Sequence, residues 1–110
     1  MKYETIELQK KDRIGTITLN RPDVLNAFSE QLIWDLQDAT KNLKEDNDIR
    51  VVIITGAGKG FTAGADLTER ESSWTSVKDS LFRGFLPIFE NIMQMPKPVI
   101  GSINGPAAGI

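Results

Sequence analysis

The sequence predicts an α/β fold, in which strands alternate with amphipathic helices along the chain. Two short, continuous apolar runs, at residues 51–55 and 99–103, are typical of parallel strands that are covered on both faces. A stretch with helical periodicity precedes each run, over residues 30–44 and 76–93. Strands that alternate with helices in this way imply an α/β fold with right-handed crossovers.

The N-terminal region is predicted to form a hairpin of two strands, at residues 3–9 and 13–20. Apolar and polar residues alternate in both stretches, and the polar residues 10–12 form the turn between them. Pro22 then ends the second strand, because proline has no N–H to donate to a strand ladder.

The first helix is predicted over residues 30–44. Ser29 is a favourable N-cap, and Phe28 is placed to pack on Ile33 one turn into the helix. The residues at helical spacing define one buried stripe: Leu32, Leu36, Ala39 and Leu43.

The second helix is predicted over residues 76–93, after an irregular polar segment at 67–73. Pro87 lies inside it and is expected to kink it or divide it in two. The rigid connector 95–98 leads on to the second apolar run. The residues expected to face inward are Val77, Leu81, Phe85, Ile88, Phe89 and Ile92.

Composition excludes several classes of function. The 110 residues are 40% hydrophobic and 25% charged, with a net charge of −2, so there is no basic footprint for nucleic acid or an anionic membrane. The chain has no cysteine and no histidine, which removes disulfides, thiolate chemistry, most zinc sites and a Ser-His-Asp triad. We expect no metal, no signal peptide and no membrane span, and a cytoplasmic location, with an organelle matrix as the alternative.

A glycine-rich loop at residues 55–67 follows the first apolar run and is the candidate binding element. Glycine lets a ligand approach the backbone closely. The P-loop pattern fails, because Ile53 stands at its first glycine and Gly60 at its hydroxyl residue. The dinucleotide pattern fails at Phe61, where it needs glycine. A nucleotide-binding fragment is therefore disfavoured, and a thermal-shift assay with NADH would test it.

Three segments resemble the crotonase, or enoyl-CoA hydratase/isomerase, superfamily. Residues 59–67, Lys-Gly-Phe-Thr-Ala-Gly-Ala-Asp-Leu, resemble its first signature. Residues 14–22 with 25–27 resemble the family's opening, and residues 97–100 with 103–109 resemble its second signature. All three occur in the family's order.

The resemblance implies the crotonase-like ββα spiral. Residues 1–110 would be the N-terminal part of a single domain, ending within the second signature loop. Crotonase-like proteins are more than twice this length, and the rest of such a chain completes the core. They typically assemble as homotrimers or hexamers.

The resemblance also implies an acyl-CoA thioester as substrate, with coenzyme A as part of the substrate and no separate cofactor. Crotonase-like enzymes stabilise an enolate with two backbone N–H groups. By position these are the N–H of Ala65 and the N–H of Ile110. Many relatives carry glycine at the second position; isoleucine keeps the N–H and is expected to narrow the pocket.

The remaining substrate contacts implied by the resemblance lie along the same loops. Coenzyme A is expected to contact Ala63, Gly64, Ala65, Asp66, Leu67 and Thr68 in the first loop, Gly109 in the second, and Val24, Leu25 and Ala27 beside the pantetheine. Lys59 and Arg21 are interpreted first as a solvated lysine and a structural arginine. Asp66 is interpreted first as a helix cap.

The proton-moving carboxylates expected of a hydratase would lie beyond Ile110. The carboxylates within the chain are interpreted as solvated charges: Glu69, Glu71, Asp79 and Glu90. We therefore expect residues 1–110 alone to be inactive and marginally folded. The parent protein is expected to be an enoyl-CoA hydratase. A Δ3-Δ2-enoyl-CoA isomerase and a non-catalytic acyl-CoA-binding protein are the alternatives, and the carboxylates after Ile110 would distinguish them.

Overall fold

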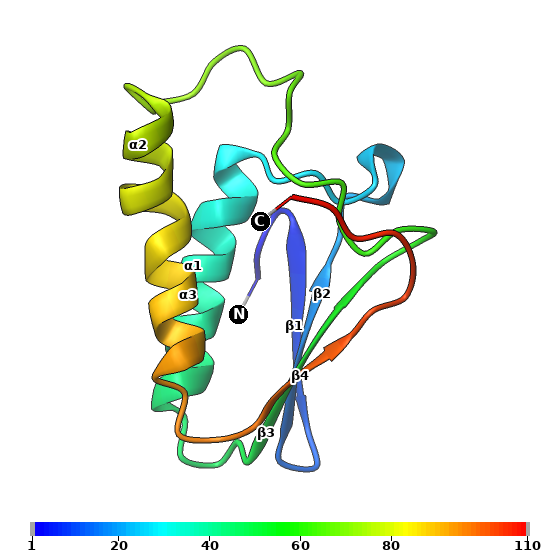
Figure 1. Ribbon diagram of the computed structural model, residues 1–110. Helices are drawn as coiled ribbons and strands as arrows, with labels where there is room; N and C mark the ends of the chain where they lie inside the picture. Colours follow the sequence, from blue (N-terminus) through cyan, green and yellow to red (C-terminus); the bar gives the residue numbers. More distant parts are fainter. Residues whose placement is uncertain (1, 110) are drawn as a thin grey trace.

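The computed structural model describes residues 2–109 as a four-stranded sheet with helices packed on one face (Figure 1). The strands lie in the order β1-β2-β3-β4. The β1–β2 pair is antiparallel, whereas β2–β3 and β3–β4 are parallel, as the α/β prediction requires. Their bounds are Ile6–Lys11 for β1, Ile14–Leu19 for β2, Val51–Gly56 for β3 and Val99–Ser102 for β4.

The predicted N-terminal hairpin is present, with a tighter turn than expected. Asp12 and Arg13 form a two-residue turn, and both have positive φ, at 54° and 66°. This geometry is that of a type I′ turn, whose twist matches the strands on either side. Lys11, which the sequence analysis assigned to the turn, instead pairs with Ile14.

Helix α1, Glu30–Glu45, confirms the first helix prediction to within a residue. Ser29 Oγ accepts the N–H of Leu32 at 3.2 Å, as expected of the N-cap. At the other end, the Lys97 ammonium donates to the carbonyls of Leu43 and Asp46, which closes the helix. The predicted stripe is buried in full and meets the sheet at Ile17, Leu19 and Val52.

The second helix is one continuous rod with an irregular middle. It comprises α2 at Val77–Asp79, a π-helical segment η2 at Ser80–Phe85 and α3 at Leu86–Met93. The expectation that Pro87 kinks or divides the helix is wrong: helical residues continue from η2 through Pro87 into α3, and the irregular π-helical segment lies before the proline.

The predicted inward face of this helix is partly wrong. Phe85 and Ile88 are buried in the core, but Val77 is 78% exposed. A π-helical turn contains more residues than an α-helical turn, so it rotates the residues before it relative to those after it. Periodicity read as one α-helix therefore places Val77 on the wrong side.

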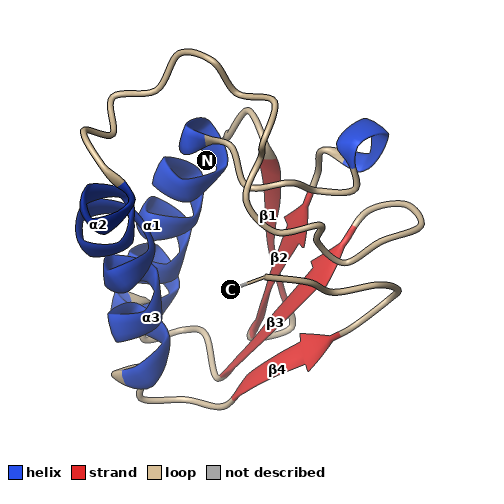
Figure 2. Cartoon of the chain, turned by 45° about the horizontal axis from the view of Figure 1, so that its top comes forward, coloured by secondary structure: helices blue, strands red, loops and turns tan. Residues whose placement is uncertain are grey.

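The expectation that the second apolar run is a buried strand is also wrong for the described residues. β4 lies at the sheet edge, where Ile100 is 50% exposed, and within β3 only Val52 is fully buried. Figure 2 shows the reason: across the part of the chain that the structure describes, helices cover a single face of the sheet. A parallel strand is buried only where both faces are covered.

Two isoleucines on β2 test this one-sided core. Ile17 is fully buried and Ile14 is 38% exposed. We expect Ile17→Ala to destabilise the chain by about 2–5 kcal/mol, because it removes buried methylenes and leaves a cavity. The matched Ile14→Ala change is expected to cost less than about 1 kcal/mol. Urea denaturation followed by circular dichroism measures both, and equal costs would contradict the one-sided packing.

Candidate functional site

Two of the three segments that carry the family resemblance, at residues 59–67 and 103–109, lie side by side in the structure. The N–H of Phe61 donates to the carbonyl of Pro106 at 2.9 Å, and the N–H of Ala108 donates to the carbonyl of Thr62 at 3.0 Å. Thr62 and Ala107 form an isolated parallel bridge. The loop after β3 and the loop after β4 therefore form one backbone unit at the end of the sheet.

The two loops approach so closely that glycine is required at the contact. A Cβ added to Gly105 would lie 2.0 Å from the Lys59 carbonyl oxygen, which leaves no room for any side chain. Gly64 and Gly109 have φ of 90° and 82°, which L side chains rarely adopt. A Cβ on Gly109 would also lie 3.0 Å from the Cα of Gly64. These contacts account for Gly64, Gly105 and Gly109 in the signature segments.

The backbone N–H of Ala65 has no hydrogen-bond acceptor among the described residues. The carbonyl before it, on Gly64, accepts from Phe28 N at 2.7 Å, and the N–H after it, on Asp66, donates to the Phe28 carbonyl at 3.1 Å. Within residues 2–109 the N–H of Ala65 donates no hydrogen bond, and Ala65 is exposed. An available backbone N–H of this kind can bind an oxygen atom of a ligand.

The second predicted donor, the N–H of Ile110, lies outside the described residues. The residue before it is well placed: a Cβ on Gly109 would lie 3.9 Å from the Ala65 nitrogen. The second loop therefore runs directly past the available N–H.

The other predicted substrate residues differ in their accessibility. Leu67 is 94% exposed and Val24 and Leu25 are about half-exposed, so their side chains can contact an apolar part of a ligand. Ala63 and Thr68 are also exposed. Ala27 is buried, so a ligand has little access to its side chain in the described chain.

The prediction that Asp66 caps a helix is wrong. Its Oδ1 accepts from the N–H and hydroxyl of Thr68, at 3.0 and 2.6 Å, and the next helix after Asp66 does not begin until Val77. Asp66 Oδ2 accepts from Arg21 at 3.1 Å, and the same guanidinium donates to the carbonyl of Ala27. The Thr68 hydroxyl, with help from Arg21, holds the pKa of Asp66 below its usual range. Asp66 is thus an ionised carboxylate that fixes the loop, and Arg21 has the expected structural role.

The segment after Asp66 crosses to the N-terminal end of α1 and is held there by carboxylates (Figure 1). The carboxylate of Glu69 accepts the backbone N–H of Glu30 at 3.0 Å. In return, the Glu30 carboxylate accepts from Trp34 at 2.9 Å and from the N–H and hydroxyl of Ser73. The Ser73 hydroxyl is the main cause that lowers the pKa of Glu30.

Aromatic stacking reinforces the same attachment. The rings of Trp34 and Trp74 lie 5.1 Å apart, and the guanidinium of Arg83 lies 5.0 Å from the Trp74 ring. Arg83 also pairs with Asp79 at 2.8 Å. Sequence reasoning missed this latch, which we define as Glu30, Trp34, Ser73 and Trp74, because its members are far apart in the sequence.

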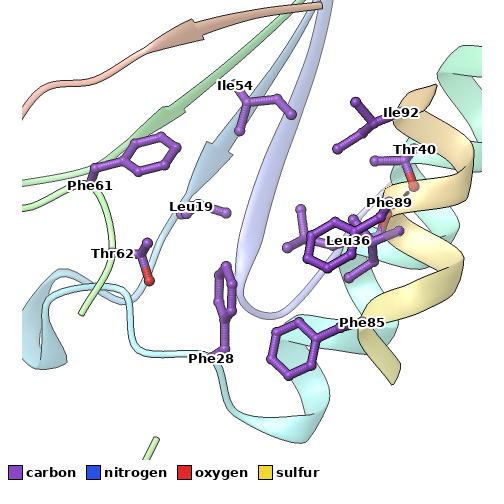
Figure 3. A pocket seen from close by; sticks show the side chains of 11 residues that line it. Leu19, Phe28, Leu36, Thr40, Ile54, Phe61, Thr62, Phe85, Phe89 and Ile92 are labelled. Atoms are coloured by element: carbon purple, nitrogen blue, oxygen red, sulfur yellow. Dashed lines mark hydrogen bonds between the residues drawn. The ribbon is translucent and has the colours of Figure 1, made fainter. Parts of the chain in front are cut away.

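A cavity of about 170 Å³ lies beneath the loop, between the sheet and the helices (Figure 3). Its only hydroxyl-bearing lining residues, Thr40 and Thr62, already donate to the carbonyls of Leu36 and Asn26. The cavity can hold hydrocarbon but cannot move a proton. Its lining comprises Leu19, Phe28, Leu36, Thr40, Ile54, Phe61, Thr62, Phe85, Ile88, Phe89 and Ile92.

The described residues also contain no group of three potential metal-binding side chains of the Asp, Glu, Cys or His types. None of the helices in residues 2–109 has the length and apolar character needed to cross a membrane.

Fold and site together define an α/β chain with a backbone-donor loop pair, and comparison with known proteins identifies its family. The family model for enoyl-CoA hydratase/isomerase matches residues 9–110. The chain therefore belongs to the enoyl-CoA hydratase/isomerase family, as the three signature segments predict.

Individual relatives carry different names within this family. The chain is 40% identical over 105 residues to a probable mitochondrial enoyl-CoA hydratase of Dictyostelium discoideum, which covers 96% of this chain and 37% of that protein. It is also 40% identical over 100 residues to the 1,2-epoxyphenylacetyl-CoA isomerase of Escherichia coli K12, with 87% and 38% covered.

Solved structures of the family share the fold. A probable enoyl-CoA hydratase from Mycobacterium smegmatis superposes with a TM-score of 0.80 at 35% identity, over 92% of this chain and 41% of that one. The chain thus spans about two fifths of the length of the relatives it matches.

The latch is expected to weaken in acid. Because the pKa of Glu30 is lower in the folded chain than in the unfolded one, its stabilisation is complete above the unfolded value, near 4.3. That stabilisation is lost as the pH falls from about 5 toward the folded pKa. We expect the fluorescence of Trp34 and Trp74 to change over this range before global unfolding.

Glu30→Gln removes the titrating group and is expected to flatten this acid transition. Glu71→Gln, an exposed change in the same segment, is the matched control and is expected to leave the transition unchanged. A transition with the same midpoint and amplitude in wild type and Glu30→Gln would exclude the latch as its cause.

Proposed function

We propose that this chain binds an acyl-CoA thioester and stabilises its enolate through the backbone N–H groups of Ala65 and Ile110. The observation that carries the proposal is the Ala65 N–H, which has no hydrogen-bond partner within residues 2–109 while Gly64 and Asp66 on either side are both bonded. Preorganised donors of this kind stabilise the charge that develops on a carbonyl oxygen in the transition state.

Coenzyme A lies along the surface that the two loops form. Its pantetheine arm contacts the exposed side chains of Val24, Leu25 and Leu67, and the backbone of residues 63–68 binds its polar groups. Gly64 and Gly109 let the two loops pack against each other beside the Ala65 N–H. Coenzyme A enters as part of the substrate, and no separate cofactor or metal is required.

The parent protein is proposed to be an enoyl-CoA hydratase, which adds hydroxide to Cβ and a proton to Cα of a trans-2-enoyl thioester. The names of several relatives support this choice. A Δ3-Δ2-enoyl-CoA isomerase is the second candidate. In both reactions the negative charge rests on the thioester oxygen between the two proton-transfer steps, so the same two donors serve either.

The proton-moving groups are proposed to lie outside residues 1–110. The acidic residues nearest the loop are already engaged: Asp66 with Arg21 and Thr68, and Glu69 with the N-terminus of α1. Residues 1–110 alone are therefore expected to be inactive. The longer protein is expected to be a trimer or hexamer in the cytoplasm or an organelle matrix.

Binding is the first test of this proposal. Isothermal titration calorimetry with crotonyl-CoA, acetoacetyl-CoA and CoA is expected to give saturable binding to the protein that contains this chain. Loss of enone absorbance then measures hydration. Binding without any turnover would favour a non-catalytic acyl-CoA-binding protein, whereas the absence of binding would sink the proposal. Clear turnover by the isolated 110-residue chain would overturn the assignment of the proton-moving groups.

Replacing Ala65 by lactate, through semisynthesis, tests the first donor directly. The substitution exchanges the N–H for an ester oxygen and keeps the side chain. We expect kcat to fall by roughly 100- to 1000-fold, the loss seen when one oxyanion-hole donor is removed. The matched ester at Ala107, whose N–H is likewise unbonded within residues 2–109, is expected to retain activity. Equal activity of both esters would exclude Ala65 as a donor.

A further inference from the structure

The carbonyl oxygen of Gly60 is the point at which three loops are joined. It accepts the side-chain amide of Asn26 at 3.0 Å and the side-chain amide of Asn104 at 3.1 Å. Asn26 belongs to the loop before α1, and Asn104 belongs to the loop after β4. One buried residue of the glycine loop is thus held from both sides by asparagines from the flanking loops.

Asn26 is fully buried, and both the oxygen and the nitrogen of its side-chain amide form hydrogen bonds. Its oxygen accepts from the N–H of Arg21 at 2.8 Å, and its nitrogen also donates to the Ala57 carbonyl at 3.0 Å. Asn26 and Leu25 both have positive φ, at 56° and 53°, which is unfavourable for leucine and is sustained only by surrounding contacts. The Asn26 hydrogen bonds supply those contacts.

Asn104, in the second signature loop, likewise forms side-chain hydrogen bonds to the backbone of the glycine loop. Its oxygen accepts from the N–H of Gly56 at 3.1 Å, and its nitrogen also donates to the Gly58 carbonyl at 3.1 Å. The next residue is Gly105, at the closest approach of the two backbones. Asn104 therefore sets how far the loop after β4 can move along the loop after β3.

A short chain of hydrogen bonds links the Asn26 residue to the peptide unit of Ala65. The Asn26 carbonyl accepts the hydroxyl of Thr62 at 2.8 Å, and that hydroxyl accepts the N–H of Gly64 at 3.1 Å. Gly64 directly precedes Ala65. Displacement of either asparagine is thereby transmitted to the peptide unit that carries the proposed donor.

We propose that Asn104, acting with Asn26 through the Gly60 carbonyl, is a positioning residue that fixes how the loop after β4 lies against the loop that carries the Ala65 N–H. This inference rests on the proposed function for its effect on catalysis, but the spacing of the loops is independent of it. The hydrogen bonds of the Asn104 side chain are all made to backbone groups of the glycine loop. A displacement of about 1 Å at a reacting centre can cost roughly 100-fold in rate.

Asn104→Ala and Asn104→Asp are the informative variants. Asn104 is exposed, and Gly60 keeps its bond from Asn26, so the fold is expected to survive. The aspartate keeps the acceptor for Gly56 but loses both donors. Thr55→Val is the matched control, because the Thr55 hydroxyl bonds the Ser102 carbonyl at 2.8 Å and links the same two strands before the loops begin.

The first measurement needs no ligand. The ¹H–¹⁵N resonance of Ala65 is expected to shift in both Asn104 variants and to stay in place in Thr55→Val. An unchanged Ala65 resonance in Asn104→Ala would overturn the proposal, whatever the enzyme's activity. This measurement also separates the two hypotheses: a protein that binds no acyl-CoA refutes the proposed function, while the resonance still decides whether Asn104 positions the loop.

The second measurement uses the protein that contains this chain and crotonyl-CoA. The Asn104 variants are expected to lose at least about tenfold in kcat with KM nearly unchanged, because ground-state binding involves the whole coenzyme A. The carbonyl stretch of ¹³C-labelled bound thioester is expected to return toward its free frequency in these variants. Parallel losses in Thr55→Val, or an unaltered stretch in Asn104→Ala, would indicate a general structural role and contradict positioning.

Discussion

The close approach of two backbones at Gly105 and the Lys59 carbonyl is the constraint on which the site depends. It is possible only where one residue has no side chain, and it brings the loops after β3 and β4 into one unit. The parallel pairing of those strands supplies the alignment, since their carboxyl ends lie at the same edge of the sheet. The Ala65 N–H has no partner within residues 2–109 because, in the parallel bridge between Phe28 and Ala65, the hydrogen bonds are made by the neighbouring Gly64 carbonyl and Asp66 N–H.

A site made of backbone groups explains what the sequence could and could not predict. The two signature loops were identifiable because their close approach requires glycine at Gly64, Gly105 and Gly109, and this requirement leaves a visible pattern. Helix α1 was predictable because its cap and its buried stripe are both local properties. The same holds for the hairpin, whose alternation is local even though the type I′ turn at Asp12 and Arg13 was missed.

The errors have a common origin in tertiary contacts. Asp66 resembles an N-cap in sequence, but Thr68 and Arg21 take up its carboxylate, and the chain then crosses to α1. The latch between Glu30 and Ser73 joins residues that no local pattern relates. The wrong face for Val77 followed from a π-helical segment, which periodicity cannot detect because it assumes a constant number of residues per turn.

The division between binding and proton transfer follows from the same chemistry. Backbone donors stabilise charge on a thioester oxygen whichever proton moves next, so under the proposed function this part of the chain would not select the reaction. In agreement with this, two relatives that are each 40% identical to the chain carry the names of a hydratase and of an isomerase. The apolar cavity and the engaged carboxylates of residues 2–109 point the same way. Under the proposed function, reaction specificity would depend on where a free carboxylate is placed relative to the Ala65 N–H, and the asparagine contacts at Gly60 would fix the reference point for that placement.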